Sequence, residues 1–128
     1  MRPQEHAPPA TPQERAVVVS KATVRAAERL GLTSALLARV VGLSEATVSR
    51  LRRGDYVLPP ASKEYELALL FLRLFRSLDA LLGGDEPAAR SWMRTENTAL
   101  RARPVDLITS VQGLVETVSY VDARRAPL

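Results

Sequence analysis

The 128-residue chain contains no cysteine and a single histidine, His6. The lack of cysteine excludes disulfides, thiolate nucleophiles and cysteine-ligated zinc. With no second histidine and no cysteine, the sequence lacks the nitrogen and sulfur ligands typical of a dedicated metal site, so we expect no metal and no cofactor. The sequence also offers no nucleophile, base and orienting group arranged for catalysis. It therefore predicts a protein that is not an enzyme.

Long hydrophobic runs are missing as well. The richest apolar stretch, LALLFLRLF from Leu67, is interrupted at Arg73 and Arg76, well short of the roughly 20 residues that a bilayer requires. The amino terminus shows no positively charged segment followed by an apolar core, so we expect no signal peptide. Hydrophobic residues make up 46% of the chain, which is enough for a core. The composition thus predicts a folded cytoplasmic protein with no membrane partner.

The net charge of +4 is unevenly distributed. Residues 1–60 contain nine Arg or Lys against five Asp or Glu, whereas residues 61–128 contain nine of each. The whole basic excess therefore belongs to the first half. This distribution favours a nucleic-acid partner for the first half and a protein partner or oligomer contact for the second.

Proline and glycine divide the chain into three parts. Residues 1–12 hold four prolines and little to bury, which predicts a disordered tail. A helix is expected from Gln13 to Leu30, and the unit that it opens, residues 13–60, closes at two consecutive prolines. Residues 61–128 form the second predicted domain. No β-pattern occurs in either unit, so the predicted fold class is all-α.

Residues 34–54 fit a helix-turn-helix position by position. Gly42 supplies the positive φ that a tight turn between two helices needs, and Ala38, four residues earlier, keeps the helices close. Ser44 is expected to cap the second helix. Inward-facing apolar side chains are predicted at Leu37, Val41, Leu43, Val48 and Leu51.

The outer surface of that second helix carries short hydrogen-bonding groups and guanidinium groups, which suit base edges and phosphates. The predicted DNA-binding residues are Glu45, Ala46, Thr47, Ser49, Arg50, Arg52 and Arg53. Among them Thr47, Ser49 and Arg50 are the candidates for base edges. The last two arginines are the candidates for phosphate contacts.

A long helix is predicted between a cap at Ser62 and a stop at Gly83. Its apolar residues occupy more than one stripe, which a helix packed on one side would not need. We therefore expect a homodimer, because two recognition helices would also hold DNA better than one. The predicted dimer residues are Phe71, Leu74, Phe75 and Leu78. Further helices are expected from Asp85, over residues 105–110, and from Leu114 to Arg124, with Gly113 as a break.

The second half resembles the toxin-binding domain of Xre/MbcA/ParS-type antitoxins, and the resemblance spans residues 33–128. Its most specific parts are ARSWMRTEN from Ala89, Leu100, the PVDLI run from Pro104, Gly113 with Leu114, and the terminal SYVDARRAPL. The sequence departs from the family at residues 101–103, Arg-Ala-Arg, where a glycine usually precedes the proline. The resemblance implies an all-α antitoxin that neutralises a RES-domain toxin, an enzyme that consumes NAD or transfers ADP-ribose from it. It also implies autorepression through operator double-stranded DNA and assembly into a higher toxin–antitoxin complex.

Joined to that resemblance, the carboxy terminus suggests how a toxin would be inhibited. An enzyme that consumes NAD must hold a pyrophosphate with cationic or backbone donors, so a carboxylate of this chain could occupy the same pocket. The terminal carboxylate and Asp122 are the candidates, with aromatic and basic neighbours at the rim. The predicted toxin-binding residues are Tyr120, Asp122, Arg124, Arg125 and Leu128.

An alternative is a simple helix-turn-helix repressor or DNA-segregation factor whose second half only dimerises. An adjacent gene for a small RES-type enzyme would favour the antitoxin, and its absence would favour the repressor.

Overall fold

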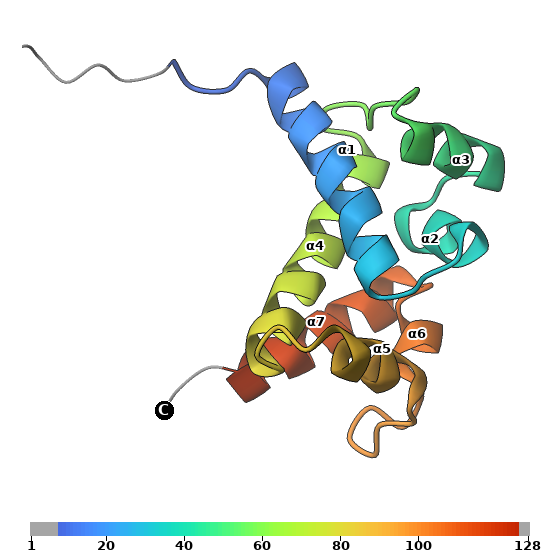
Figure 1. The fold of residues 1–128 in the computed structure, drawn as a ribbon, viewed down its shortest axis with the longest axis vertical. Helices are drawn as coiled ribbons and strands as arrows, with labels where there is room; N and C mark the ends of the chain where they lie inside the picture. The colour runs from blue at the N-terminus through green and yellow to red at the C-terminus, as the bar shows by residue number, and fades with distance from the viewer. Residues whose placement is uncertain (1–7, 126–128) are drawn as a thin grey trace, which may run out of the picture.

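A computed structural model describes residues 8–125, and this part of the chain forms seven helices and no strand, which confirms the all-α prediction (Figure 1). The helices are α1 (Pro12–Arg29), α2 (Ser34–Val41), α3 (Glu45–Arg53), α4 (Lys63–Leu81), α5 (Glu86–Arg94), α6 (Pro104–Leu107) and α7 (Val111–Arg125). None of the described helices is both long and apolar enough to cross a bilayer.

Helix α1 begins one residue earlier than the sequence predicts. Thr11 and Glu14 form a capping box in which each side chain accepts a hydrogen bond from the other's backbone N–H, at 3.1 Å and 2.8 Å. Pro12 follows in the first turn, where its missing N–H costs nothing. Of the tail predicted over residues 1–12, residues 1–7 lie outside the described part. Residues 11 and 12 belong to the start of α1 instead, because the box fixes them.

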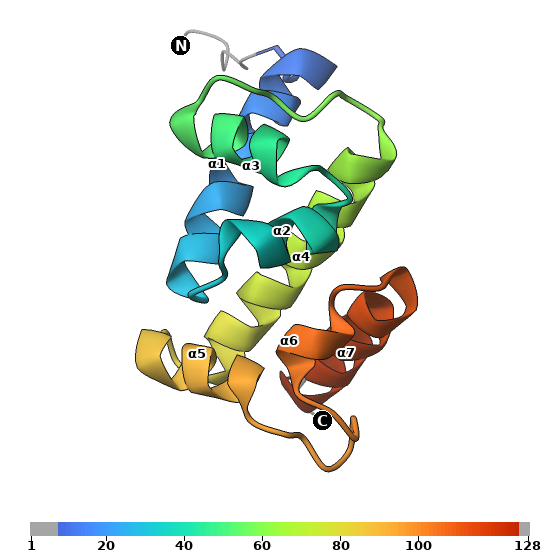
Figure 2. The same cartoon turned by 90° about the vertical axis from the view of Figure 1, so that its right-hand side faces the viewer.

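Helix α4 is the element around which the others pack. Figure 2 shows α1, α2 and α3 around its amino-terminal half and α5, α6 and α7 around its carboxy-terminal half. It contacts α7, α1, α2 and α5 directly, so its apolar residues are covered from several directions within one chain. The core includes side chains from both halves, among them Leu30, Leu37, Phe71, Met93 and Leu114.

The multiple apolar stripes of α4 therefore have a different cause from the predicted dimer contact. Phe71, Leu74 and Leu78 have no exposed surface, and Phe75 is partly buried beneath the guanidinium of Arg29, 6.0 Å from the ring centre. The first three are core residues of the single chain, so the prediction that they contact a second copy is wrong in this structure. Dimerisation itself stays a prediction. A dimer would have to form through residues other than these three.

Gly113 also has a different role from the predicted helix break. It lies inside α7, buried against the end of α6. A Cβ at this position would lie 2.0 Å from the carbonyl oxygen of Leu107 and 2.7 Å from its carbonyl carbon. Glycine is thus needed here for the close approach of two backbones. The final helix starts at Val111, before the predicted start at Leu114.

Candidate functional site

The helix-turn-helix has the predicted geometry. Gly42 has a φ of 74°, and its N–H donates to the carbonyl of Ala38 at 2.9 Å. Ser44 caps α3 by accepting a hydrogen bond from the N–H of Thr47 at 3.1 Å. Four of the five predicted inward residues are buried, and Leu43 is partly buried against the same core. The bend and the cap together hold α3 against α2 with its polar face outward.

The outer face of α3 is organised around Arg50. Its guanidinium lies 3.4 Å from the hydroxyl of Thr47 and 5.5 Å from the ring centre of Tyr56. The Thr47 hydroxyl also accepts from Ser44 at 2.9 Å. These contacts hold Arg50 across the exposed face of α3. Tyr56 could not be predicted from the sequence, because it lies beyond the helix in a loop with no periodic signal.

The remaining outer residues of α3 fall into two groups. Glu45, Ala46 and Arg53 are exposed, and Ser49 is partly buried. Arg53 pairs with Asp55 at 3.2 Å, but both side chains are about 60% exposed. Such an exposed pair is weak in water, so Arg53 can exchange Asp55 for a phosphate.

Arg52 does not point outward as the phosphate role requires. Its guanidinium donates to the carbonyl of Leu32, in the connection between α1 and α2, at 3.0 Å. Its Nε atom is buried and has no hydrogen-bond partner within the described residues. The structure therefore gives Arg52 a role in holding the loop before α2 to α3.

The predicted toxin-binding residues of α7 lie on two different sides of the helix. Tyr120 and Arg124, one turn apart, stack with the guanidinium 5.6 Å from the ring centre. Asp122 instead faces α4, and Arg125 lines the hollow beside it. The structure thus does not bring these four side chains to one surface. Leu128 lies outside the described residues.

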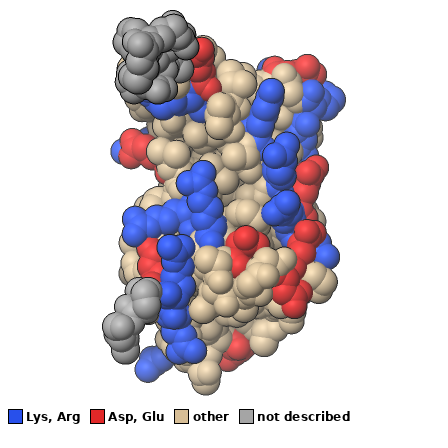
Figure 3. Space-filling model, turned by 60° about the vertical axis from the view of Figure 1, so that its left-hand side comes forward, with Lys and Arg blue, Asp and Glu red and all other residues tan. Residues whose placement is uncertain are grey.

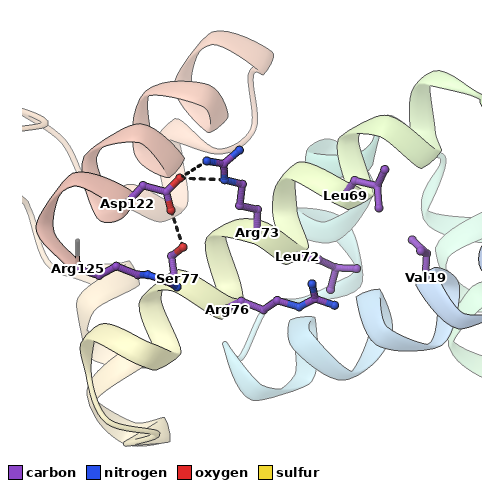
Figure 4. A pocket seen from close by; sticks show the side chains of 8 residues that line it. All are labelled: Val19, Leu69, Leu72, Arg73, Arg76, Ser77, Asp122 and Arg125. Carbon is purple, nitrogen blue, oxygen red and sulfur yellow. Dashed lines mark hydrogen bonds and ion pairs between the residues drawn. The ribbon is translucent and has the colours of Figure 1, made fainter. Parts of the chain in front are cut away.

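Asp122 ties α7 to α4 (Figure 4). One of its carboxylate oxygens accepts from the Nε and Nη2 atoms of Arg73, at 2.8 Å and 2.7 Å, and the other accepts from the hydroxyl of Ser77 at 2.5 Å. The hydrogen bond from Ser77 lowers the pKa of Asp122 against the opposing effect of its burial, and Arg73 lowers this pKa further. Asp122 is therefore a bridge within the chain, and it is not free to enter a toxin's pocket.

We expect Asp122→Asn to reduce the free energy of unfolding by about 1 kcal/mol at neutral pH, because the charge-assisted hydrogen bonds to Asp122 are lost. The reduction is no larger because Arg73 is exposed, and solvent weakens its ion pair with Asp122. Because the folded pKa is lowered, the wild-type advantage is full above the carboxyl's ordinary pKa and disappears as the pH falls through the lowered value. Urea unfolding of both proteins across this range measures the difference.

The matched control is Asp106→Asn, which breaks an ion pair between exposed residues three apart, Arg103 and Asp106. Its effect on stability should be clearly smaller than that of Asp122→Asn. A free energy of unfolding that is equally reduced in both variants would contradict the bridging role of Asp122.

The described residues contain no cluster of histidine or carboxylate side chains that could hold a metal ion. The loop after α5 is closed by Asn97, whose side-chain oxygen accepts from the N–H of Leu100 at 3.0 Å. Trp92 is partly buried and packs against the core. Both residues therefore have structural roles.

Comparisons with known proteins give three results. Residues 8–73 match the antitoxin Xre-like helix-turn-helix domain, and residues 77–126 match the antitoxin Xre/MbcA/ParS C-terminal toxin-binding domain. The fold is similar to a chain in the crystal structure of the M. tuberculosis MbcT–MbcA toxin–antitoxin complex, with a TM-score of 0.64 and 25% identity, over 84% of this chain and 94% of that chain. No protein of curated function matches significantly.

Proposed function

This chain belongs to the Xre-type antitoxins, and from that premise we propose that it neutralises a RES-domain toxin and represses its own operon. The observation that carries the proposal is the order of the two matched domains, a helix-turn-helix followed by a toxin-binding domain along almost the whole chain. The chain acts as a binding protein in the cytoplasm, where both the operator DNA and the toxin are found, and it catalyses no reaction itself.

The toxin side of the proposal uses the carboxy-terminal domain. The toxin consumes NAD or transfers ADP-ribose from it, so its pocket must stabilise a pyrophosphate. With Asp122 held by Arg73 and Ser77, the segment that follows α7 and includes Leu128 remains as the candidate to occupy this pocket. The partly buried Tyr120 and the exposed Arg124 stacked on it lie in the last turns of α7, and they would contact the toxin surface around this pocket.

The DNA side uses α3. A homodimer would present two recognition helices to a pseudo-palindromic operator, with Thr47, Ser49 and Arg50 at base edges and Arg53 at a phosphate. Operator binding by the antitoxin, alone or as part of a higher complex with toxin, would lower transcription of both genes. The exposed geometry of Arg50 and Arg53 supports this assignment.

Co-expression in bacteria tests the toxin side. The RES-type enzyme encoded beside this chain should arrest growth and lower cellular NAD when expressed alone, and both effects should disappear when this chain is expressed with it. A variant that lacks residues 126–128 should be folded and soluble, yet rescue poorly. Truncation at Tyr120 is a poorer test, because it also removes the buried Val121 and the Asp122 bridge.

Two outcomes would count against this reading. Growth arrest that the full-length chain does not relieve would contradict the antitoxin function. Equal rescue by full-length and shortened chains would place the inhibitory surface on the helices instead of the terminus.

A further inference from the structure

A groove with a charged part and an apolar part lies where α1, α4 and α7 meet. It has a volume of about 640 Å³. Arg73, Arg76 and Arg125 stand along it, with Val19, Leu69 and Leu72 between α1 and α4 (Figure 4). Asp122 is the acidic residue of its lining, and Arg73 already neutralises this carboxylate. The groove therefore keeps a positive potential above an apolar surface.

A second hollow continues this groove along α1. Arg25, Arg29 and Phe75 line it, and it shares Leu72 and Arg76 with the first groove. Figure 3 shows basic side chains gathered on this side of the molecule. Together the two hollows, hereafter the arginine face, contain five arginines and one aspartate. This surface was not visible in the sequence, because its arginines come from three helices far apart in the chain.

Two of these arginines have no hydrogen-bond or ion-pair partner among the described residues. Neither Arg25 nor Arg76 makes a hydrogen bond or ion pair with another described residue, and both are exposed. Arg76 is common to both hollows and thus occupies the centre of the arginine face. Like charges that line one surface repel one another, so an arrangement of this kind favours a ligand that supplies negative charge.

The location separates the arginine face from the DNA-binding surface. In Figure 1, α3 lies on the right of the molecule, whereas Figure 3 brings the left side forward. DNA on the recognition helix of one chain therefore leaves this face uncovered. The face also crosses the boundary between the matched domains, since α1 belongs to the helix-turn-helix match and α7 to the toxin-binding match.

Charge and shape favour an acidic protein segment over other ligands. A two-fold contact with a second copy would set arginines against arginines, which disfavours self-association through this face. A phosphate backbone has no apolar side chains to cover the apolar part of the groove, formed by Val19, Leu69 and Leu72. A segment that carries both carboxylates and apolar side chains satisfies both parts of the groove.

We propose that the arginine face docks an acidic, amphipathic segment of the toxin, so that the toxin contacts α1 and α4 as well as the carboxy-terminal domain. This inference rests on the proposed function, because it names the partner of the same antitoxin. Its consequence is physical contact between the bound toxin and the first helix of the DNA-binding unit. Toxin binding would then directly affect α1, the helix that packs against α3.

The experiment is a binding titration of the full-length protein with its cognate RES-type toxin at two salt concentrations. Arg76→Glu should weaken toxin binding by at least about tenfold and reduce its salt dependence, because a like charge then faces the acidic segment. Arg25→Glu should do the same from α1. The matched control is Arg39→Glu, an equal charge change at an exposed position on α2, which should leave toxin affinity near the wild-type value.

Thermal unfolding and operator binding are measured on the same samples. Arg76→Gln, which removes the charge without reversing it, should give an intermediate affinity and covers the case in which the glutamate variant folds poorly. Wild-type affinity in the folded Arg76→Gln and Arg25→Glu variants would overturn the inference. So would weakened operator binding with unchanged toxin binding, which would make this face a DNA surface. Failure of the wild-type protein itself to bind the toxin would instead contradict the proposed function.

Discussion

The Arg50→Ala/Arg53→Ala double variant is expected to lose operator affinity on the order of 100-fold while remaining folded. Arg50 is held over the outer face of α3 by Thr47 and Tyr56, and a base contact of this type is worth roughly 1 to 3 kcal/mol. The proposed phosphate contact of Arg53 would add to this loss. Fluorescence anisotropy with the operator duplex, at several salt concentrations, measures both losses.

The single variants separate the two roles. Arg50→Ala should relax sequence preference. Arg53→Ala should instead weaken binding to all duplexes alike and reduce the slope of log affinity against log salt concentration by about one. Arg52→Ala is the informative comparison, because the structure gives that residue an internal contact with the Leu32 carbonyl. It should lower stability more than it changes sequence preference. Wild-type operator affinity in the double variant would show that this surface is not the DNA site.

Gly113→Ala is expected to destabilise the protein by about 3 kcal/mol or more. The added Cβ would lie 2.0 Å from the Leu107 carbonyl oxygen, which belongs to backbone and cannot rotate away. Relief requires α7 to move, and this helix carries the buried Leu114, Val118 and Val121 into the core. Chemical unfolding followed by circular dichroism measures the loss.

The direction of the stability change in Gly113→Ala distinguishes a constrained glycine from an unconstrained one. Alanine in a helix is ordinarily favoured over glycine by roughly 0.5 to 1 kcal/mol, so an unconstrained Gly113 would give a more stable variant. Val115→Ala, at an exposed position on the same helix, is the control and should change stability little. Unchanged or increased stability of Gly113→Ala would contradict the close approach of α6 and α7.

The helix-turn-helix could be predicted from sequence because local rules determine it. The cap at Ser44, the left-handed Gly42 and the spacing of Leu37, Val41 and Val48 each act within a few residues. The start of α1 follows the same kind of rule, a capping box, which the proline content of the tail obscured.

The role of α4 could not be predicted because apolar spacing does not identify what covers a helix. A surplus of leucine and phenylalanine is compatible with a second copy or with other helices of the same chain. In this fold α1, α2, α5 and α7 supply the cover. Gly113 shows the same limit, since a glycine that ends a helix and one that admits a neighbouring backbone look identical in sequence.

The partners of the candidate site side chains could not be predicted from the sequence either, because they too depend on how the helices pack. Arg52 and Arg53 are adjacent in sequence, yet one contacts the Leu32 carbonyl and the other an exposed aspartate. Asp122 was assigned to a toxin contact from its place near the terminus, but its partners, Arg73 and Ser77, lie on another helix. Such pairings depend on how the helices pack, which periodicity does not specify.

The loop before α6 accommodates its departure from the family pattern by backbone geometry. Arg101 adopts a φ of 62°, a conformation that glycine enters more easily, and its N–H donates to the carbonyl of Asn97 at 2.7 Å. The Asn97 N–H in turn donates to the Ala102 carbonyl at 3.0 Å. Hydrogen bonds to Asn97 therefore close the turn despite the missing glycine.

Antitoxin function is tested most directly by NAD turnover of the purified RES-type toxin as this protein is added. Turnover should fall to background as the two proteins approach binding stoichiometry, and the Arg50→Ala/Arg53→Ala variant should inhibit equally well because α3 lies apart from the toxin-binding domain. Undiminished NAD turnover in the presence of excess folded wild-type protein would contradict the antitoxin function.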